Sequence, residues 1–102
     1  MEETRNLGIG ISFRLHEACW HGHRHIVQKL LDEGASIEAR DHNQCSSLHI
    51  ASEEGYEEVV QVLMAAGADK EATQNQQCTP LHLAAREGHE AVVQVLLAAG
   101  AD

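Results

Sequence analysis

The stretch CTPLHLAAREGHEAVVQVLLAAGAD, residues 78–102, repeats the stretch CSSLHIASEEGYEEVVQVLMAAGAD, residues 45–69, at a distance of 33 residues. Seventeen of the 25 paired positions are identical. The same shift aligns Leu48 with Leu15, so a more diverged copy precedes these two. A regular repeat of this length indicates an array in which each copy is one structural unit. We expect a single domain of 102 residues with its copies at about residues 8–40, 41–73 and 74–102.

The third copy carries the signals of two short helices. Thr79 can cap a helix with its hydroxyl, and Pro80 suits the first helical position, where a missing backbone N–H costs nothing. Gly88 supplies the left-handed residue that ends this helix. A second helix is expected from about Glu90 to Gly100, with an acidic residue at the positive end of its dipole. Because two short helices cannot bury both of their faces alone, neighbouring copies must stack into an all-α solenoid.

A known motif can be followed through the third copy, at residues 78–85, 88–89, 96–97 and 100–102. It resembles the ankyrin repeat, and the resemblance covers the chain from about Ile11. The resemblance implies an ankyrin-repeat solenoid of helix-turn-helix units with short β-turn fingers. It also implies a concave surface that binds protein partners without catalysis and without a cofactor. In this family the histidine that matches His16, His49 and His82 ties the turn of a repeat to its neighbour through hydrogen bonds.

The chain departs from the family pattern at the helix starts and in the fingers. Ser46 and Ser47 stand where the family prefers Thr-Pro, as do Phe13 and Arg14 in the first copy, so these two helix starts should be less rigid. In the fingers, glutamine occupies a turn position where glycine is usual. We therefore expect non-glycine residues in the left-handed conformation, with some strain, at Gln44 and Gln77.

Charge and composition restrict the partner. The net charge of −9 argues against nucleic acid and anionic membranes, both of which attract clustered Lys and Arg. After Arg40, only Lys70 and Arg86 oppose ten acidic residues, which slightly favours a protein partner with a basic surface. No apolar run reaches the length of a membrane helix. The three cysteines are an odd number, and we interpret them as reduced thiols of an intracellular, cytoplasmic protein.

The binding surface is expected where the copies differ. The second and third copies agree at core positions but differ at the exposed end of the first helix and at the finger tips, which is what a recognition surface needs. Two roles are open for Trp20: it anchors an interface, or it packs on the segment from Leu7 to Phe13. The predicted partner-binding residues are Trp20, His21, Arg40, His42, Asn43, Glu53, Glu54, Thr73, Asn75, Gln76, Arg86 and Glu87.

Metal binding and catalysis have little support in the sequence. His21, His23 and His25 are a weak metal candidate, because Gly22 interrupts the helix and residues two apart do not share a helical face. Protonation of His23 and His25 beside the positive end of a helix is expected to loosen the first copy near pH 5.5. Paired glutamates such as those at 53–54 have no partner nucleophile, so we expect a protein that is not an enzyme.

Two functions remain open. The first is a protein-binding module that uses the concave face and the finger tips. The second is a structural piece that self-associates, because no polar capping repeat covers apolar residues such as Val92 and Leu96. A regulatory domain of a larger enzyme or channel is a more distant alternative.

Overall fold

Six helices make up the computed structural model, which describes the backbone of residues 2–101 and the side chains of residues 10–101. They are α1 (Glu2–His21), α2 (Arg24–Asp32), α3 (Ser47–Glu54), α4 (Glu57–Ala65), α5 (Pro80–Arg86) and α6 (Glu90–Ala98). Over this described range the chain forms no strand. The predicted all-α class is therefore confirmed.

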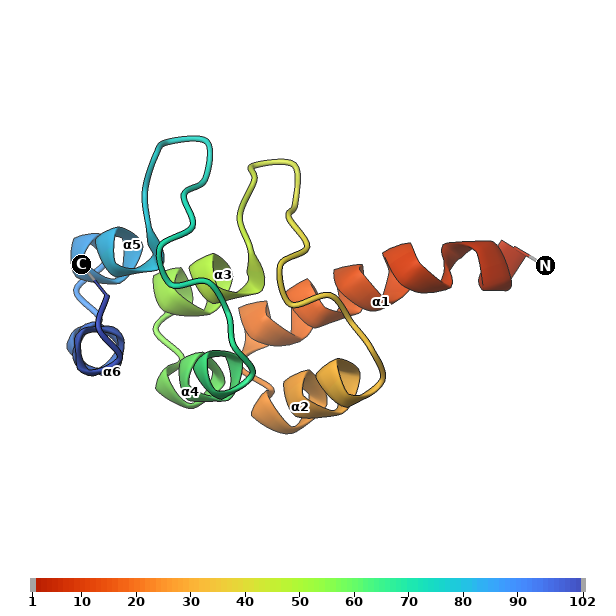
Figure 1. Ribbon diagram of the computed structural model, residues 1–102, viewed down its shortest axis with the longest axis horizontal. Helices are drawn as coiled ribbons and strands as arrows, with labels where there is room; N and C mark the ends of the chain where they lie inside the picture. The colour runs from red at the N-terminus through yellow and green to blue at the C-terminus, as the bar shows by residue number, and fades with distance from the viewer. Residues whose placement is uncertain (1, 102) are drawn as a thin grey trace.

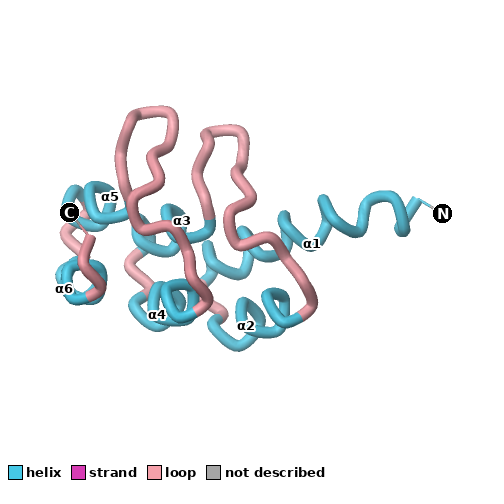
Figure 2. Tube along the Cα trace, viewed as in Figure 1, coloured by secondary structure: helices cyan, strands magenta, loops and turns pink. Residues whose placement is uncertain are grey.

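The helices are arranged in two rows. Each repeat contributes a pair, α1 with α2, α3 with α4, and α5 with α6. The first helices α1, α3 and α5 pack side by side, and the second helices α2, α4 and α6 form a parallel row beneath them (Figure 1). The long loops after α2 and α4 project next to each other from the stack (Figure 2). We call residues 38–45 the first finger and residues 71–78 the second finger.

Two of the helix starts follow from a reciprocal cap. Thr79 Oγ1 accepts a hydrogen bond from the backbone N–H of His82, and His82 Nδ1 accepts one from the Thr79 N–H. Ser46 and His49 make the same pair at the start of α3. Each cap satisfies two backbone donors that the helix leaves open, with imidazole in place of the usual Glu or Gln. Ser46 thus caps α3 in the same way as Thr79 caps α5, although the Thr-Pro pair is missing there.

The expectation of a helix start at Phe13 and Arg14 is wrong. The helix α1 runs without interruption from Glu2 to His21 and extends beyond the stack (Figure 1). Phe13 has no side-chain oxygen that could cap a helix, and no proline follows it, so nothing in the sequence stops the helix from continuing upstream.

The continuous helix also decides the position of Trp20. Phe13 and Trp20 are seven residues apart, which places them two turns apart on the same face, about 10 Å along the axis. Their side chains are 65% and 59% exposed. Of the two roles left open for Trp20, packing on the segment from Leu7 to Phe13 has no support from these exposed fractions at Phe13, while the side chains of Leu7 to Ile9 lie outside the described residues.

The fingers repeat one hydrogen-bond frame. In the first finger, Asp41 Oδ1 accepts from the N–H groups of Asn43 and Cys45 at 2.8 and 2.9 Å. Gln74, 33 residues later, accepts with Oε1 from the N–H groups of Gln76 and Cys78 at 2.7 and 3.1 Å. The tight turn requires a left-handed residue, and it is occupied by Gln44 at φ 64° and by Gln77 at φ 66°. The predicted left-handed glutamines are confirmed.

His49 connects the second repeat to the third. Its side chain is fully buried, and Nε2 lies 3.0 Å from the carbonyl oxygens of both Ala72 and Cys78 in the second finger. His16 Nε2 similarly contacts the Ala39 carbonyl oxygen of the first finger at 2.9 Å. These bonds confirm the structural role that the resemblance implied for both histidines. Because Nε2 faces acceptors and Nδ1 accepts from Ser46, His49 is neutral, with its proton on Nε2.

Acid is expected to weaken the stack at His49. Burial lowers the pKa of His49 below its ordinary value of 6.5, against the opposing effect of its two carbonyl partners. Below about pH 6.5 the unfolded chain therefore binds more protons than the folded one, so the free energy of unfolding falls as the pH decreases. Urea unfolding at about pH 7.5 and about pH 5.5 should show this loss for the wild type.

The matched control for this pH effect is His49→Gln. This variant cannot titrate at position 49, so its stability should decrease less between the two pH values than that of the wild type. An equal decrease in both proteins would show that other groups cause the acid response. Among these groups are His23 and His25, and the loosening of the first repeat on their protonation stays a prediction.

Candidate protein-binding site

A groove of about 640 Å³ lies between α1, α3 and the first finger. Half of the twelve predicted partner-binding residues line it: Trp20, His21, His42, Asn43, Glu53 and Glu54. The tertiary structure therefore brings together residues that are separated by up to 34 positions in the chain. The stacking of α1 against α3 forms one side of the groove, and the finger that connects their repeats forms the other.

The apolar part of the groove comes mainly from α1. Phe13 and Trp20 are both largely exposed, and the half-buried Ile50 of α3 also lines the groove. Exposed large aromatic side chains that share one groove are typical of interaction surfaces, since they bury much area at a small cost in side-chain entropy.

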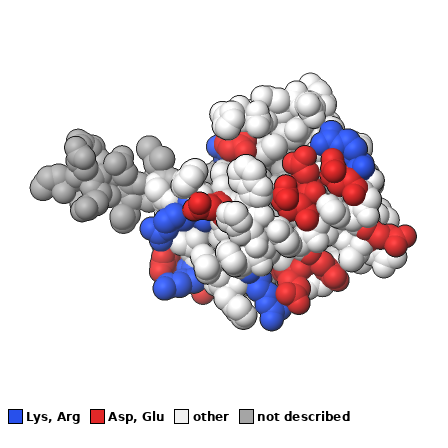
Figure 3. All heavy atoms as spheres, turned by 180° about the vertical axis from the view of Figure 1, so that it is seen from behind, with Lys and Arg blue, Asp and Glu red and all other residues white. Residues whose placement is uncertain are grey.

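The rest of the groove is acidic. The carboxylates of Glu17, Asp41, Glu53 and Glu54 line it. None of the described lining residues is a Lys or Arg. The helices α1 and α3 both end here, so their dipoles add partial negative charge. On the face that is hidden in Figure 1, acidic side chains gather over the half of the molecule away from the N-terminus (Figure 3). The groove therefore favours cationic ligands.

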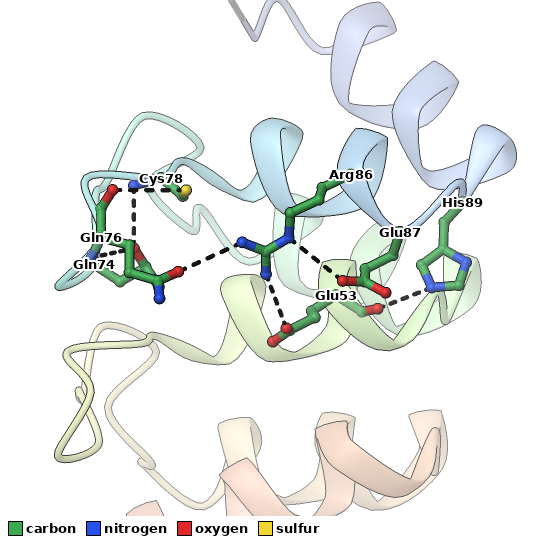
Figure 4. Close-up of polar contacts among 7 residues, drawn as sticks. All are labelled: Glu53, Gln74, Gln76, Cys78, Arg86, Glu87 and His89. Carbon is green, nitrogen blue, oxygen red and sulfur yellow. Dashed lines mark hydrogen bonds and ion pairs between the residues drawn. The ribbon is translucent and has the colours of Figure 1, made fainter.

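Arg86 continues this surface beyond the groove. Its guanidinium contacts the carboxylates of Glu53 at 3.3 Å and Glu87 at 3.4 Å, and the side-chain oxygen of Gln76 at 3.4 Å. The backbone carbonyl of Glu53 also accepts a hydrogen bond from His89 Nε2 at 2.8 Å. Figure 4 shows Arg86 at the centre of this network, between the second finger, α3 and the end of α5. Glu53 thus belongs both to the groove and to the Arg86 network.

Comparison with known families identifies the architecture. A family model that describes ankyrin repeats in three copies matches residues 15–102. The chain belongs to the ankyrin-repeat family. A search of curated proteins gives no significant match. Ankyrin repeats are generally protein–protein interaction modules and are typically not enzymes. Within the described residues, no helix of this ankyrin domain is both long enough and apolar enough to cross a membrane.

Three of the predicted residues lie outside both the groove and the Arg86 network. Arg40 Nη1 donates to the backbone carbonyls of Gln44 and Thr73 at 2.8 Å each, so its guanidinium joins the two ankyrin fingers. This contact involves the backbone carbonyl of Thr73, and the side chain of Thr73 is exposed. Asn75 donates its N–H to the Asn43 carbonyl at 3.1 Å. These contacts join the two fingers and hold the first finger in place as one side of the groove.

Removing the guanidinium of Arg40 is expected to loosen the fingers. In Arg40→Met the apolar stem stays, but two charged hydrogen bonds are lost. Because the side chain is exposed, we expect a modest cost of about 1 kcal/mol, or roughly fivefold faster amide exchange at Asn75 and Gln44. The matched control is Arg24→Met on α2, which removes only an exposed ion pair with Glu58 at 3.5 Å. Equal exchange rates in the two variants would show that Arg40 does not hold the fingers.

Several residues that line the groove were not among the predicted partner-binding residues. Phe13 was interpreted as a poor helix start, although its spacing of seven residues from Trp20 would have placed both on one helical face once α1 was known to be continuous. Glu17 lies between them on the same helix. Asp41 and Ile50 carry no separate signal, because their approach to α1 depends on how the repeats stack.

The weak metal candidate is only partly assembled. The rings of His21 and His23 lie with their centroids 6.0 Å apart, and His25 is exposed on α2. Across the described part of this ankyrin domain, no group of three or more His, Cys, Asp or Glu side chains could hold a metal ion. We therefore propose no metal site here.

The cysteines are suited to packing rather than to chemistry. All three are free thiols. Burial raises the pKa of Cys19 to about 12 and also raises the pKa of Cys45. Because the thiolate is the reactive form, both thiols are poor nucleophiles at neutral pH.

Proposed function

We propose that this ankyrin domain is a non-catalytic module that binds a partner protein through the groove and the finger tips. The observation that carries the proposal is the pair of exposed aromatic side chains, Phe13 and Trp20, in one acidic groove. The backbone around the groove is preorganised, because α1 is a single helix and Arg40 joins the fingers. A preorganised surface loses less entropy on binding, so more of the contact energy appears as affinity.

Capture experiments with matched variants test this function. The immobilised domain is compared with a groove variant, Phe13→Ser with Trp20→Ser, and with Leu97→Ser. Leu97 is 52% exposed on α6 and lies outside the groove, so its variant removes a comparable apolar side chain elsewhere. Partners should be retained by the wild type and by Leu97→Ser, and lost by at least about tenfold with the groove variant, since interface anchors cost about 1.4 kcal/mol or more. Circular dichroism establishes that each variant is folded.

Equal retention of every partner by the groove variant would contradict this proposal. Loss with Leu97→Ser alone would instead favour the second candidate, self-association through the third repeat. That candidate has its own support: Leu48 and His49 are fully buried beneath the third repeat, whereas the matched Leu81 is only half-buried and His82 is exposed. Light scattering over a range of concentrations tests it, and a strict monomer at high concentration would exclude it.

An intracellular, cytoplasmic location is part of the same proposal. Its support is the set of three free thiols in one small domain, which is typical of a reducing compartment. Alkylation of the thiols in intact and in lysed cells tests it, and protection by a disulfide in both would contradict it.

A further inference from the structure

The Arg86 network has a counterpart one repeat earlier, but the counterpart lacks an arginine. Arg86 lies among Glu87, the finger residue Gln76 and Glu53 of the preceding repeat. A shift of 33 residues replaces these three neighbours by Glu54, Asn43 and Trp20, and it replaces Arg86 itself by Glu53. All four of the replacing residues line the groove. In the third repeat the domain thus places its own guanidinium among these neighbours. In the groove, the corresponding residues surround no arginine of the domain.

We propose that the groove binds an arginine side chain of the partner protein, with the guanidinium between Trp20, Asn43 and Glu54. This inference rests on the proposed function and names the chemistry of the partner at that surface. The bound guanidinium takes the place that corresponds to the Arg86 guanidinium one repeat later. There it meets an indole face, an amide oxygen and a carboxylate.

The charges of the groove support a cation at this place. Glu53 is already paired with Arg86, but the Glu54 carboxylate has no hydrogen-bond or ion-pair partner among the described residues. Glu54 is exposed at the end of α3, where the helix dipole adds negative charge. The described lining residues include four carboxylates and three histidines but no Lys or Arg, so with its histidines neutral the groove repels an acidic segment and attracts a basic one.

The aromatic side chain selects arginine over lysine. A guanidinium is planar, so it can stack on the exposed indole of Trp20 while its edge donates two hydrogen bonds to a carboxylate. An ammonium group is a hydrated point charge and cannot do both. Phe13 and Ile50 line the same groove, so apolar residues that flank the arginine would add to binding.

The experiment uses the fluorescence of Trp20, which is the only tryptophan of the chain. The intact domain is titrated with the capped peptide acetyl-Gly-Leu-Arg-Leu-Gly-amide and with the same peptide carrying Lys or Gln at the centre. The Arg peptide should change the emission saturably at concentrations below about 10 mM, which is the affinity range of a single cation–π and ion-pair contact. We expect the Lys peptide to bind at least about threefold more weakly and the Gln peptide at least about tenfold more weakly.

A matched pair of variants separates the site from net charge. Glu54→Gln should weaken the Arg peptide at least about fivefold. Glu57→Gln removes the same charge from α4, outside the groove, and should weaken it less than about twofold. Both positions are exposed, so both variants are expected to fold.

Three results would overturn the inference: no saturable change with the Arg peptide, equal binding of the Arg and Gln peptides, or equal effects of the two variants. If any of these occurs while the groove variant still loses its partner protein, the proposed function stands and the arginine inference fails. If the groove variant retains every partner, the proposed function fails as well.

Discussion

Replacing His49 with alanine is expected to lower the free energy of unfolding by about 3 to 5 kcal/mol. The variant loses the imidazole half of the reciprocal cap of α3, the Nδ1 atom that accepts from the Ser46 N–H, which is worth about 1 kcal/mol, while Ser46 Oγ still accepts from the backbone N–H of residue 49. It also removes the imidazole donor from the carbonyl oxygens of Ala72 and Cys78. The Cys78 carbonyl still accepts from the Gln74 N–H, but the Ala72 carbonyl keeps no partner among the described residues, and a buried acceptor without a partner costs about 1 to 3 kcal/mol. Urea unfolding followed by circular dichroism measures the change.

The third repeat provides the control for His49. His82 makes the same cap with Thr79, but it is exposed, and Nε2 has no hydrogen-bond partner among the described residues. His82→Ala should therefore cost only about 1 kcal/mol, the value of the lost bond between the Thr79 N–H and the imidazole. If the two alanine variants were equally destabilised, the contact of His49 with the second finger would not be what holds these repeats together.

Replacing Gly55 with alanine should cost about 2 to 4 kcal/mol. Gly55 ends α3 in the left-handed conformation, at φ 82°, which side chains other than glycine adopt only with strain. A Cβ at this position would also lie 2.5 Å from the His89 ring, so the ring would have to move. His89 would then lose its hydrogen bond to the Glu53 carbonyl, and the start of α6 would shift away from α3.

A variant at Gly88 distinguishes the backbone strain from the contact with the neighbouring repeat. It ends the first helix of its repeat at φ 77°, but a Cβ there would meet no atom within 4 Å. Gly88→Ala should therefore cost only the backbone strain of about 1 kcal/mol. The difference between the two variants in urea unfolding measures the contact between neighbouring repeats. Equal losses would show that strain alone accounts for both glycines.

The contact at Gly55 also bears on the binding surface. His89 is held against the backbone of Glu53, whose side chain lies between the groove and Arg86. A shift of α3 against the third repeat would therefore displace an acidic group of the groove. We expect Gly55→Ala to weaken partner binding through the groove as well as stability, whereas Gly88→Ala should leave binding unchanged.

The features that the sequence predicted well are local and repeated. They are the cap at Thr79, the left-handed glutamines and the helix pair of the third copy. Each depends on a few neighbouring residues, and similar residues recur 33 positions earlier in the second copy. The first copy was predicted less well for the same reason. Its missing cap at Phe13 was interpreted as a weak helix start, although a missing stop signal equally allows a longer helix.

The functional roles of single residues depended on the stack. Arg40 and Trp20 were predicted for the same binding surface, yet Arg40 joins the two fingers, while Trp20 lies exposed in the groove. A sequence states the chemistry of a side chain but not which group from another repeat will lie beside it. That distance is set by the packing of α1 on α3 and of one finger on the next.

The sequence by itself determined the ankyrin fold, the cap at Thr79, the turn conformations of the fingers and the acidic character of the domain, because these follow from local backbone preferences and from the sum of charges. The tertiary structure alone decided which residues share the groove, that Glu53 is paired while Glu54 is open, and that His49 is buried while His82 is not. The physical reason is that identical residues in successive repeats acquire different surroundings from their neighbours, and hydrogen bonding, burial and pKa depend on those surroundings.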